Sequence, residues 1–174
     1  MSENDFQGLV QVYTGDGKGK TTAALGQALR ACEQGLKVIF IQFLKTQPGG
    51  EHLFAQKYKP FEILQFGQGD LFEKGEDQLL AETKQAYDYA VKALSGGQYD
   101  MVVLDEIFIA HWRGFLSLAQ IMDLMKMKPA NVELILTGRK APQEVVKKAD
   151  LVTEMLMIKH PFSDGVQQRK GIEY

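Results

Sequence analysis

The chain has 174 residues, and 20 lysines and arginines against 22 aspartates and glutamates give a formal net charge of −2. This length suits one domain over residues 1–174, and the near-neutral charge gives no general attraction to nucleic acid or to anionic membranes. The single cysteine, Cys32, excludes a disulfide framework and a paired-cysteine zinc or redox site. No apolar run is long enough for a membrane span and the first residues are not a leader, so we expect a cytoplasmic protein.

Short apolar runs alternate along the chain with segments of helical period, as in a sheet whose strands are joined by crossover helices. The first run leads into a glycine-rich loop, and a helix should follow it as far as Gly35. We therefore expect a doubly wound α/β domain of about six strands and four or five helices. The predicted strands span residues 9–14, 37–44, 61–66, 101–104, 132–137 and 151–157, and the later helices span 77–94, 117–127 and 142–149.

The loop between the first strand and the first helix is the strongest motif. Its glycines, Gly15, Gly17 and Gly19, allow backbone N–H groups to approach anionic oxygens, with the positive end of a helix behind them. In such a loop Lys20 would reach the β- and γ-phosphates and Thr21 would ligate Mg²⁺. Only three residues separate Gly15 from Gly19 where the usual motif has four, so the loop is either one residue short or entered through threonine.

Two further segments end at the same predicted edge of the sheet. The apolar run at residues 101–104 leads into Asp105 and Glu106, as in a Walker B element, and either carboxylate could hold Mg²⁺ directly or through water. Arg139 follows a later strand, where it would contact phosphate or form a structural ion pair. The residues themselves thus indicate a Mg²⁺-dependent binder of a nucleoside triphosphate, with the second substrate undetermined.

Several segments, taken in order, resemble one known family. These are the GDGKGKTTAA loop at residues 15–24, the strand at 101–106, the TGR segment at 137–139, the ADLVTE segment at 149–154 and the HPF…G…GIEY tail at 160–174. Together they are similar to the ATP:corrinoid adenosyltransferases of the cobalamin pathway, over nearly the whole chain. The combination of the loop with the tail is the specific part of this resemblance, because many families share a phosphate loop.

The resemblance implies a RecA-like P-loop fold with a mostly parallel sheet and helices on both faces, in a homodimer. It also implies transfer of the 5′-deoxyadenosyl group of ATP to the cobalt(I) of a reduced corrinoid, with release of triphosphate. Mg²⁺ or Mn²⁺ would assist, and a flavoprotein or another reductase would supply the electron. The implied ATP-binding residues are Gly15, Asp16, Gly17, Lys18, Gly19, Lys20, Thr21, Thr22, Arg30 and Arg139, with Lys20, Thr21 and Glu106 as catalytic residues and Thr21, Asp105 and Glu106 on the metal.

For the corrinoid, the resemblance implies contacts from Gly69, Phe72, His160 and Phe162. Some family members also carry a phenylalanine and a tryptophan after the third strand, which displace the lower ligand of cobalt. Gln68 and Asp70 occupy those positions in this chain. We therefore expect either that Phe72 substitutes for them after a shift, or that the lower face is handled differently.

Two other kinds of function remain open from the residues. A P-loop phosphotransferase or ATPase would attack the γ-phosphate and produce ADP. An ATP-gated binding protein would use the nucleotide only to switch a partner-binding surface. The tail sequence favours the adenosyltransferase over both.

Overall fold

A computed structural model describes residues 6–45, 47–67, 69 and 73–173. Its six-stranded sheet is parallel at every pairing and has the strand order β3-β2-β4-β5-β1-β6. This confirms the α/β fold of the P-loop type, since β5 lies between the strand that enters the glycine loop and the strand that ends in Asp105. The strands are β1 (Val10–Thr14), β2 (Val38–Gln42), β3 (Glu62–Gln65), β4 (Met101–Asp105), β5 (Glu133–Thr137) and β6 (Leu151–Glu154).

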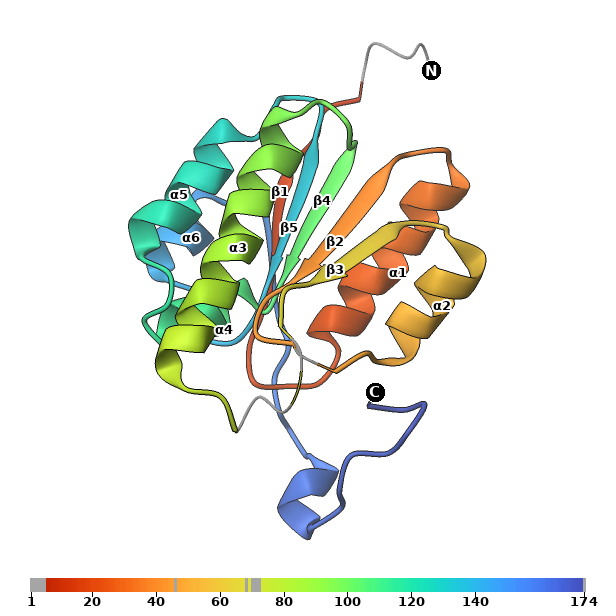
Figure 1. Ribbon diagram of the computed structural model, residues 1–174, viewed down its shortest axis with the longest axis vertical. Coiled ribbons are helices and arrows are strands. Elements are labelled where there is room, and N and C mark those ends of the chain that lie inside the picture. Colours follow the sequence, from red (N-terminus) through yellow and green to blue (C-terminus); the bar gives the residue numbers. More distant parts are fainter. Residues whose placement is uncertain (1–5, 46, 68, 70–72, 174) are drawn as a thin grey trace.

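Helices cover both faces of the sheet, as the sequence indicates. Figure 1 shows α1 and α2 against one face and the other four helices against the opposite face. Small side chains let the longer helices pack closely: Ala24 and Ala28 of α1 and Ala90 of α3 are all fully buried. The helices are α1 (Lys20–Glu33), α2 (Gly50–Tyr58), α3 (Glu76–Ser95), α4 (Ile107–Trp112), α5 (Leu118–Met127) and α6 (Gln143–Lys148).

Three sequence-based expectations need correction. The helices α2 and α4 were not expected, which brings the described α-helices to six. The last strand ends at Glu154, because residues 155–157 leave the sheet and pass along the glycine loop. Elsewhere the expected signals hold: Ser117 caps α5 by accepting a hydrogen bond from Gln120 N, and Gly35 lies just beyond α1 with φ +83°.

The carboxyl-terminal tail crosses the edge of the sheet where the strands end. After β6 the chain forms a short 3₁₀ helix, Pro161–Asp164, and continues back toward α1 (Figure 1). His160 caps this turn by accepting a hydrogen bond from Phe162 N at 3.2 Å. The tail therefore lies over the edge at which parallel α/β sheets bind their ligands. Over the residues that the structure describes, no helix is both long and apolar enough to cross a membrane.

Candidate functional site

An open pocket of about 590 Å³ lies between the glycine loop and the tail. Residues 16–22 line one side of it, together with Glu106 and Arg139. The opposite side consists of tail residues that include His160 and Phe162. The fold thus brings into one pocket residues that the resemblance assigns to ATP and residues that it assigns to the corrinoid. Its volume suits a nucleotide-sized ligand.

The conformation of the glycine loop depends on its contact with residues 155–156. Gly15 and Gly19 have backbone φ angles of +96° and +123°, which residues other than glycine rarely adopt. A Cβ atom on Gly17 would lie 2.7 Å from the carbonyl oxygens of both Met155 and Leu156, and Gly17 N donates to Met155 O at 2.7 Å. The loop glycines therefore allow close packing against the strand extension, residues 155–156, which follow β6. This packing requires glycine in the loop in addition to the close approach of phosphate expected from the sequence.

Lys20 begins α1 and points back under the loop. Its Nζ donates to the carbonyl oxygens of Gly15 and Gly17, both at 2.7 Å, and the residue is only 6% exposed. Burial lowers the pKa of Lys20 below its ordinary value, while the charge of Glu106 acts in the opposite direction. The ammonium group is therefore held at the floor of the loop by backbone oxygens, in position to meet an anion bound above it.

Asp105 organises the polar groups at the end of β4. Its Oδ1 accepts hydrogen bonds from the hydroxyls of Thr21 (3.0 Å) and Thr137 (2.6 Å), and its Oδ2 accepts one from Gln42 Nε2 (3.0 Å). Asp105 is 1% exposed, and burial raises the pKa of its carboxyl while the three donors lower it. With both oxygens already occupied, this carboxylate is better placed to orient Thr21 than to bind a metal ion directly.

Glu106 differs from its neighbour in having an unused oxygen. It adopts φ +60°, its N–H donates to Thr137 Oγ1 at 3.0 Å, and its buried Oε2 has no hydrogen-bond partner among the described residues. Burial and the nearby charge of Asp105 raise the pKa of Glu106 to about 7. A strained backbone that delivers an unsatisfied carboxylate to a pocket is characteristic of a functional residue.

The oxygen-rich chemistry of this corner suits Mg²⁺. The Thr21 hydroxyl donates its hydrogen to Asp105, and its oxygen keeps lone pairs for a metal ion. Glu106 Oε2 accepts no hydrogen bond from the part of the chain that the structure describes. Within the described parts of the chain, no group of three histidine, cysteine or acidic side chains forms a complete metal site. Mg²⁺ commonly binds through one or two protein oxygens, with substrate phosphates and water as its other ligands, so the two residues fit such an ion.

Of the other expected site residues, Arg139 lies at the pocket, whereas Arg30 and Gly69 do not line it. Arg139 Nη1 donates to Asp16 Oδ1 at 3.2 Å, an ion pair at the mouth of the pocket. Arg30 lies on the last turn of α1, ten residues after Lys20 and about 15 Å away along the axis, and does not line the pocket. Gly69 lies outside the pocket as well, with φ +88°. Phe72, Gln68 and Asp70 fall outside the described residues.

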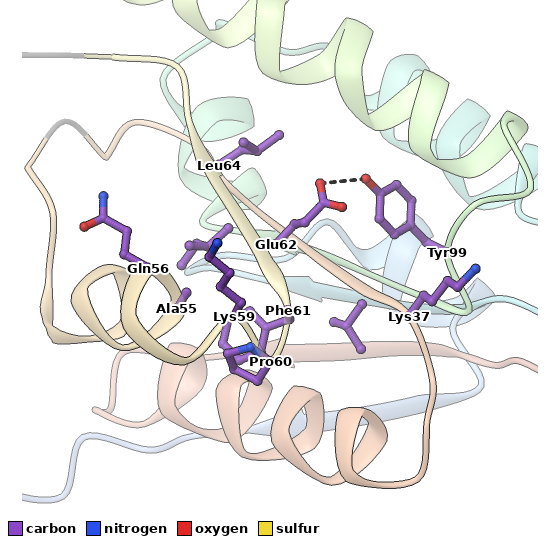
Figure 2. A pocket seen from close by; sticks show the side chains of 11 residues that line it. Lys37, Ala55, Gln56, Lys59, Pro60, Phe61, Glu62, Leu64 and Tyr99 are labelled. Carbon is purple, nitrogen blue, oxygen red and sulfur yellow. Dashed lines mark hydrogen bonds between the residues drawn. The ribbon is translucent and has the colours of Figure 1, made fainter.

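A separate hollow of about 460 Å³ lies beside the edge strand β3 (Figure 2). Its floor includes Phe61 and Leu64, and on its rim Tyr99 donates a hydrogen bond to Glu62 at 2.9 Å. It shares no residue with the pocket at the glycine loop. The chemistry expected from the sequence is therefore concentrated at the other pocket.

Comparison with known proteins identifies the family. The family model described as ATP:corrinoid adenosyltransferase BtuR/CobO/CobP matches residues 6–174. The chain belongs to this family. Curated corrinoid adenosyltransferases are similar to it: that of Pseudomonas aeruginosa is 34% identical over 98% of this chain and 85% of its own, and that of Escherichia coli K12 is 34% identical over 98% and 87%. A corrinoid adenosyltransferase of Sinorhizobium is 35% identical, over 99% of this chain and 83% of its own.

Membership of the ATP:corrinoid adenosyltransferases confirms the identification made from the loop and tail motifs, and it does not favour the ATPase or the gated binding protein. Sequence reasoning missed three participants in the site: Gln42, the carbonyl groups of residues 155–156, and Glu173. Gln42 carried a usable signal, as the one polar residue ending a run of buried apolar residues, and Glu173 lies within the tail motif although no role was assigned to it. The carbonyl groups act through tertiary contacts that no local pattern encodes.

Proposed function

We propose that this protein transfers the 5′-deoxyadenosyl group of ATP to the reduced cobalt of a corrinoid. The observation that carries the proposal is the pocket in which the glycine loop, Glu106 and Arg139 face His160 and Phe162. In the reaction, the electron pair of cobalt(I) attacks the ribose C5′, a cobalt–carbon bond forms, and the C5′–oxygen bond breaks. Triphosphate leaves with the electron pair of that bond, so the protein need supply no general base.

The protein's part in this reaction is alignment and charge stabilisation. The loop amides of residues 15–22 bind the triphosphate, and Lys20 and Arg139 add positive charge beside it. Thr21 and Glu106 would hold Mg²⁺ or Mn²⁺, with Asp105 orienting the Thr21 hydroxyl. When bound, that ion supplies further neutralisation of the negative charge on the departing triphosphate. The residues we assign to the corrinoid are His160 and Phe162, together with Gly69 and Phe72.

The arrangement of exposed apolar side chains supports a homodimer. β6 is an edge strand whose four residues are all exposed, and Leu156 and Ile158 in the following tail are 68% and 93% exposed. Exposed large apolar side chains beside an edge strand are typical of interaction sites, so we propose that a second copy of the chain covers them. Sedimentation of the purified protein tests this, and a monomer at micromolar concentration contradicts it. We also propose that a flavoprotein or another reductase delivers the electron to cobalt.

The reaction itself is tested by anaerobic incubation with ATP, Mg²⁺ and a chemically reduced corrinoid. We expect phosphorus NMR to show triphosphate, and the corrinoid spectrum to change to that of an alkyl-cobalt species, in equal amounts. Incubation without the corrinoid is the control and should leave ATP intact. Formation of ADP and phosphate with no alkyl-cobalt product would refute the proposal in favour of phosphoryl transfer.

A further inference from the structure

Three polar side chains lie next to one another at the carboxyl ends of adjacent strands. Gln42 ends β2, and it is in register with Gln65 at the end of β3 and with Asp105 at the end of β4. In a parallel sheet, residues in register project to the same face. The three side chains therefore form a row across the edge of the sheet, from the strand that precedes the loop at residue 66 to the site beside the glycine loop.

The row is connected by hydrogen bonds in one direction. Gln65 Nε2 donates to Gln42 Oε1 at 3.1 Å and to the carbonyl oxygen of Gln47 at 3.2 Å. Gln42 Nε2 then donates to Asp105 Oδ2 at 3.0 Å. Asp105 Oδ1 accepts the hydroxyl hydrogen of Thr21 at 3.0 Å. An unbroken chain of donors and acceptors thus extends from Gln65 to the first turn of α1.

The central member of the row is tightly constrained. Gln42 is 1% exposed, and an ionised carboxylate only accepts hydrogen bonds, so the Gln42 amide must present its NH₂ group to Asp105 and its carbonyl to Gln65. Without Gln42, Oδ2 of the buried Asp105 would lose its donor, which is costly in a site of low dielectric. Asp105 could then rotate away from Thr21 to find another partner.

We propose that Gln42 is a positioning residue, which holds Asp105 in the orientation that directs the Thr21 hydroxyl toward the metal ion bound with ATP. The proposal rests on the proposed function in so far as Thr21 serves that ion. Gln65 is the outer member of the row and fixes the Gln42 amide. Gln65 also donates to the Gln47 carbonyl, so the same side chain connects the row to the segment between β2 and α2.

Replacing Gln42 by methionine tests the proposal, because methionine keeps the length of the side chain and removes its hydrogen bonds. We measure the affinity for ATP by calorimetry in EDTA and again in excess Mg²⁺. We expect Gln42→Met to leave the affinity in EDTA near that of the unmodified protein and to reduce the gain produced by Mg²⁺ about tenfold or more, as losses of residues that support metal ligands do. A merely structural role would lower the unfolding temperature without this selective loss.

The matched control is Gln11→Met, the same substitution on another strand of the sheet. Gln11 also bridges two partners, since it donates to Glu133 and its Oε1 accepts from the Tyr13 hydroxyl. It lines neither the pocket nor the row, so the gain from Mg²⁺ should be unchanged in this variant. If Gln42→Met and Gln11→Met show the same gain from Mg²⁺, the proposal is overturned.

Gln65→Met provides a second, milder test, which holds even if Gln42→Met fails to fold. Gln65 is half-buried, and its loss leaves the bond between Gln42 and Asp105 in place, so we expect the gain from Mg²⁺ to fall roughly threefold. In the double variant the two effects on the gain from Mg²⁺ should not add, because the hydrogen bonds connect Gln65 to Asp105 through Gln42. Additive effects, or an unchanged gain in Gln65→Met, contradict the row. Failure of the proposed function is distinguishable, because the unmodified protein would then form no alkyl-cobalt product.

Discussion

Lys18 Nζ donates to Glu173 Oε1 at 3.0 Å and so joins the glycine loop to the carboxyl-terminal tail. Lys18 also donates to the carbonyl oxygen of Ile172 at 3.3 Å, and Glu173 receives Arg169 Nη2 at 2.9 Å. Two cations therefore converge on one tail carboxylate. One of these cations belongs to the loop assigned to triphosphate, so the position of the tail and the binding of ATP should influence each other.

Glu173→Gln should loosen the tail by removing the charge that Lys18 and Arg169 share. Because such pairs lie near solvent and are screened by salt, we expect proteolysis within residues 158–172 to accelerate by up to about fivefold at low ionic strength, and less in 0.5 M salt. Hydrogen bonds from Arg169 and Lys18 lower the pKa of Glu173 to about 2. The stabilising effect is therefore complete above the ordinary pKa and is lost only as the pH falls toward 2. Equal proteolysis of both proteins at low salt would contradict this role.

Lys20→Ala should reduce the rate of adenosyl transfer about a hundredfold or more at saturating ATP. The lysine is buried at the floor of the loop, and its loss removes a preorganised charge from the departing triphosphate. Steady-state kinetics with pre-reduced corrinoid measures the effect. Lys84→Ala is the control, since Lys84 lies on α3 with a side chain 72% exposed and should leave the rate unchanged. A near-normal rate in Lys20→Ala would exclude the lysine from the site.

Glu106→Gln should stabilise the protein in the absence of ligands. The pKa of Glu106 is about 7 in the folded state, above its ordinary 4.5, so the folded state binds the extra proton. The loss of folding free energy caused by the charge of Glu106 is absent below pH 4.5. It grows as the pH rises from 4.5 to 7 and is complete above 7. Removing the charge should therefore raise the unfolding free energy at pH 8 by at least about 1 kcal/mol, or roughly 2–4 °C in Tm, and have little effect at pH 4.5. Calorimetry at both values checks this, and an equal shift at both would contradict it.

Gly17→Ala should disrupt the glycine loop. The added methyl group would meet the backbone oxygens of Met155 and Leu156 at 2.7 Å, so the loop or the strand extension must move. We expect a loss of about 1–3 kcal/mol in unfolding free energy and weakened ATP binding. Gly26→Ala is the matched control, because Gly26 is inside α1 and, apart from its own helix backbone, no described atom lies within 4 Å of its Cβ position. It should gain up to about 1 kcal/mol. Comparable losses in both variants would show that the contact with residues 155–156 is unimportant.

The four inner strands, β1, β2, β4 and β5, were predictable because each is a run of mostly buried, mostly apolar residues. Residues 155–157 were predicted to continue the last strand because all three are apolar. They are not buried in the sheet, however: Leu156 and Met157 are exposed. The helix α4 was missed because its six residues are too few to show a helical period, and Ile107 and Phe108 occur in strands as readily as in helices. In α2, polar and apolar residues are mixed without a clear face.

The candidate site was predictable where one segment carries the chemistry, as in the loop at residues 15–22 and the pair Asp105 and Glu106. The different roles of these two carboxylates were not predictable. They depend on the fold, which gives hydrogen-bond donors to both oxygens of Asp105 and leaves Glu106 Oε2 without one among the described residues. The partnership of Gln42 with Gln65 depends on the lateral register of two strands. Register depends on how the buried faces of all the strands fit together, so it could not be read from the local sequences of these two strands.

The pairing of β1 has a consequence for the order in which the protein can mature. Over the described residues, this first strand pairs with β5 and β6 alone, both of which lie in the last third of the given sequence. The glycine loop that follows β1 rests on residues 155–156, which are synthesised later still. A growing chain on the ribosome therefore carries the segment that we propose to bind ATP without its partners until residues 155–156 have been synthesised, and ATP can help to complete folding only after that point.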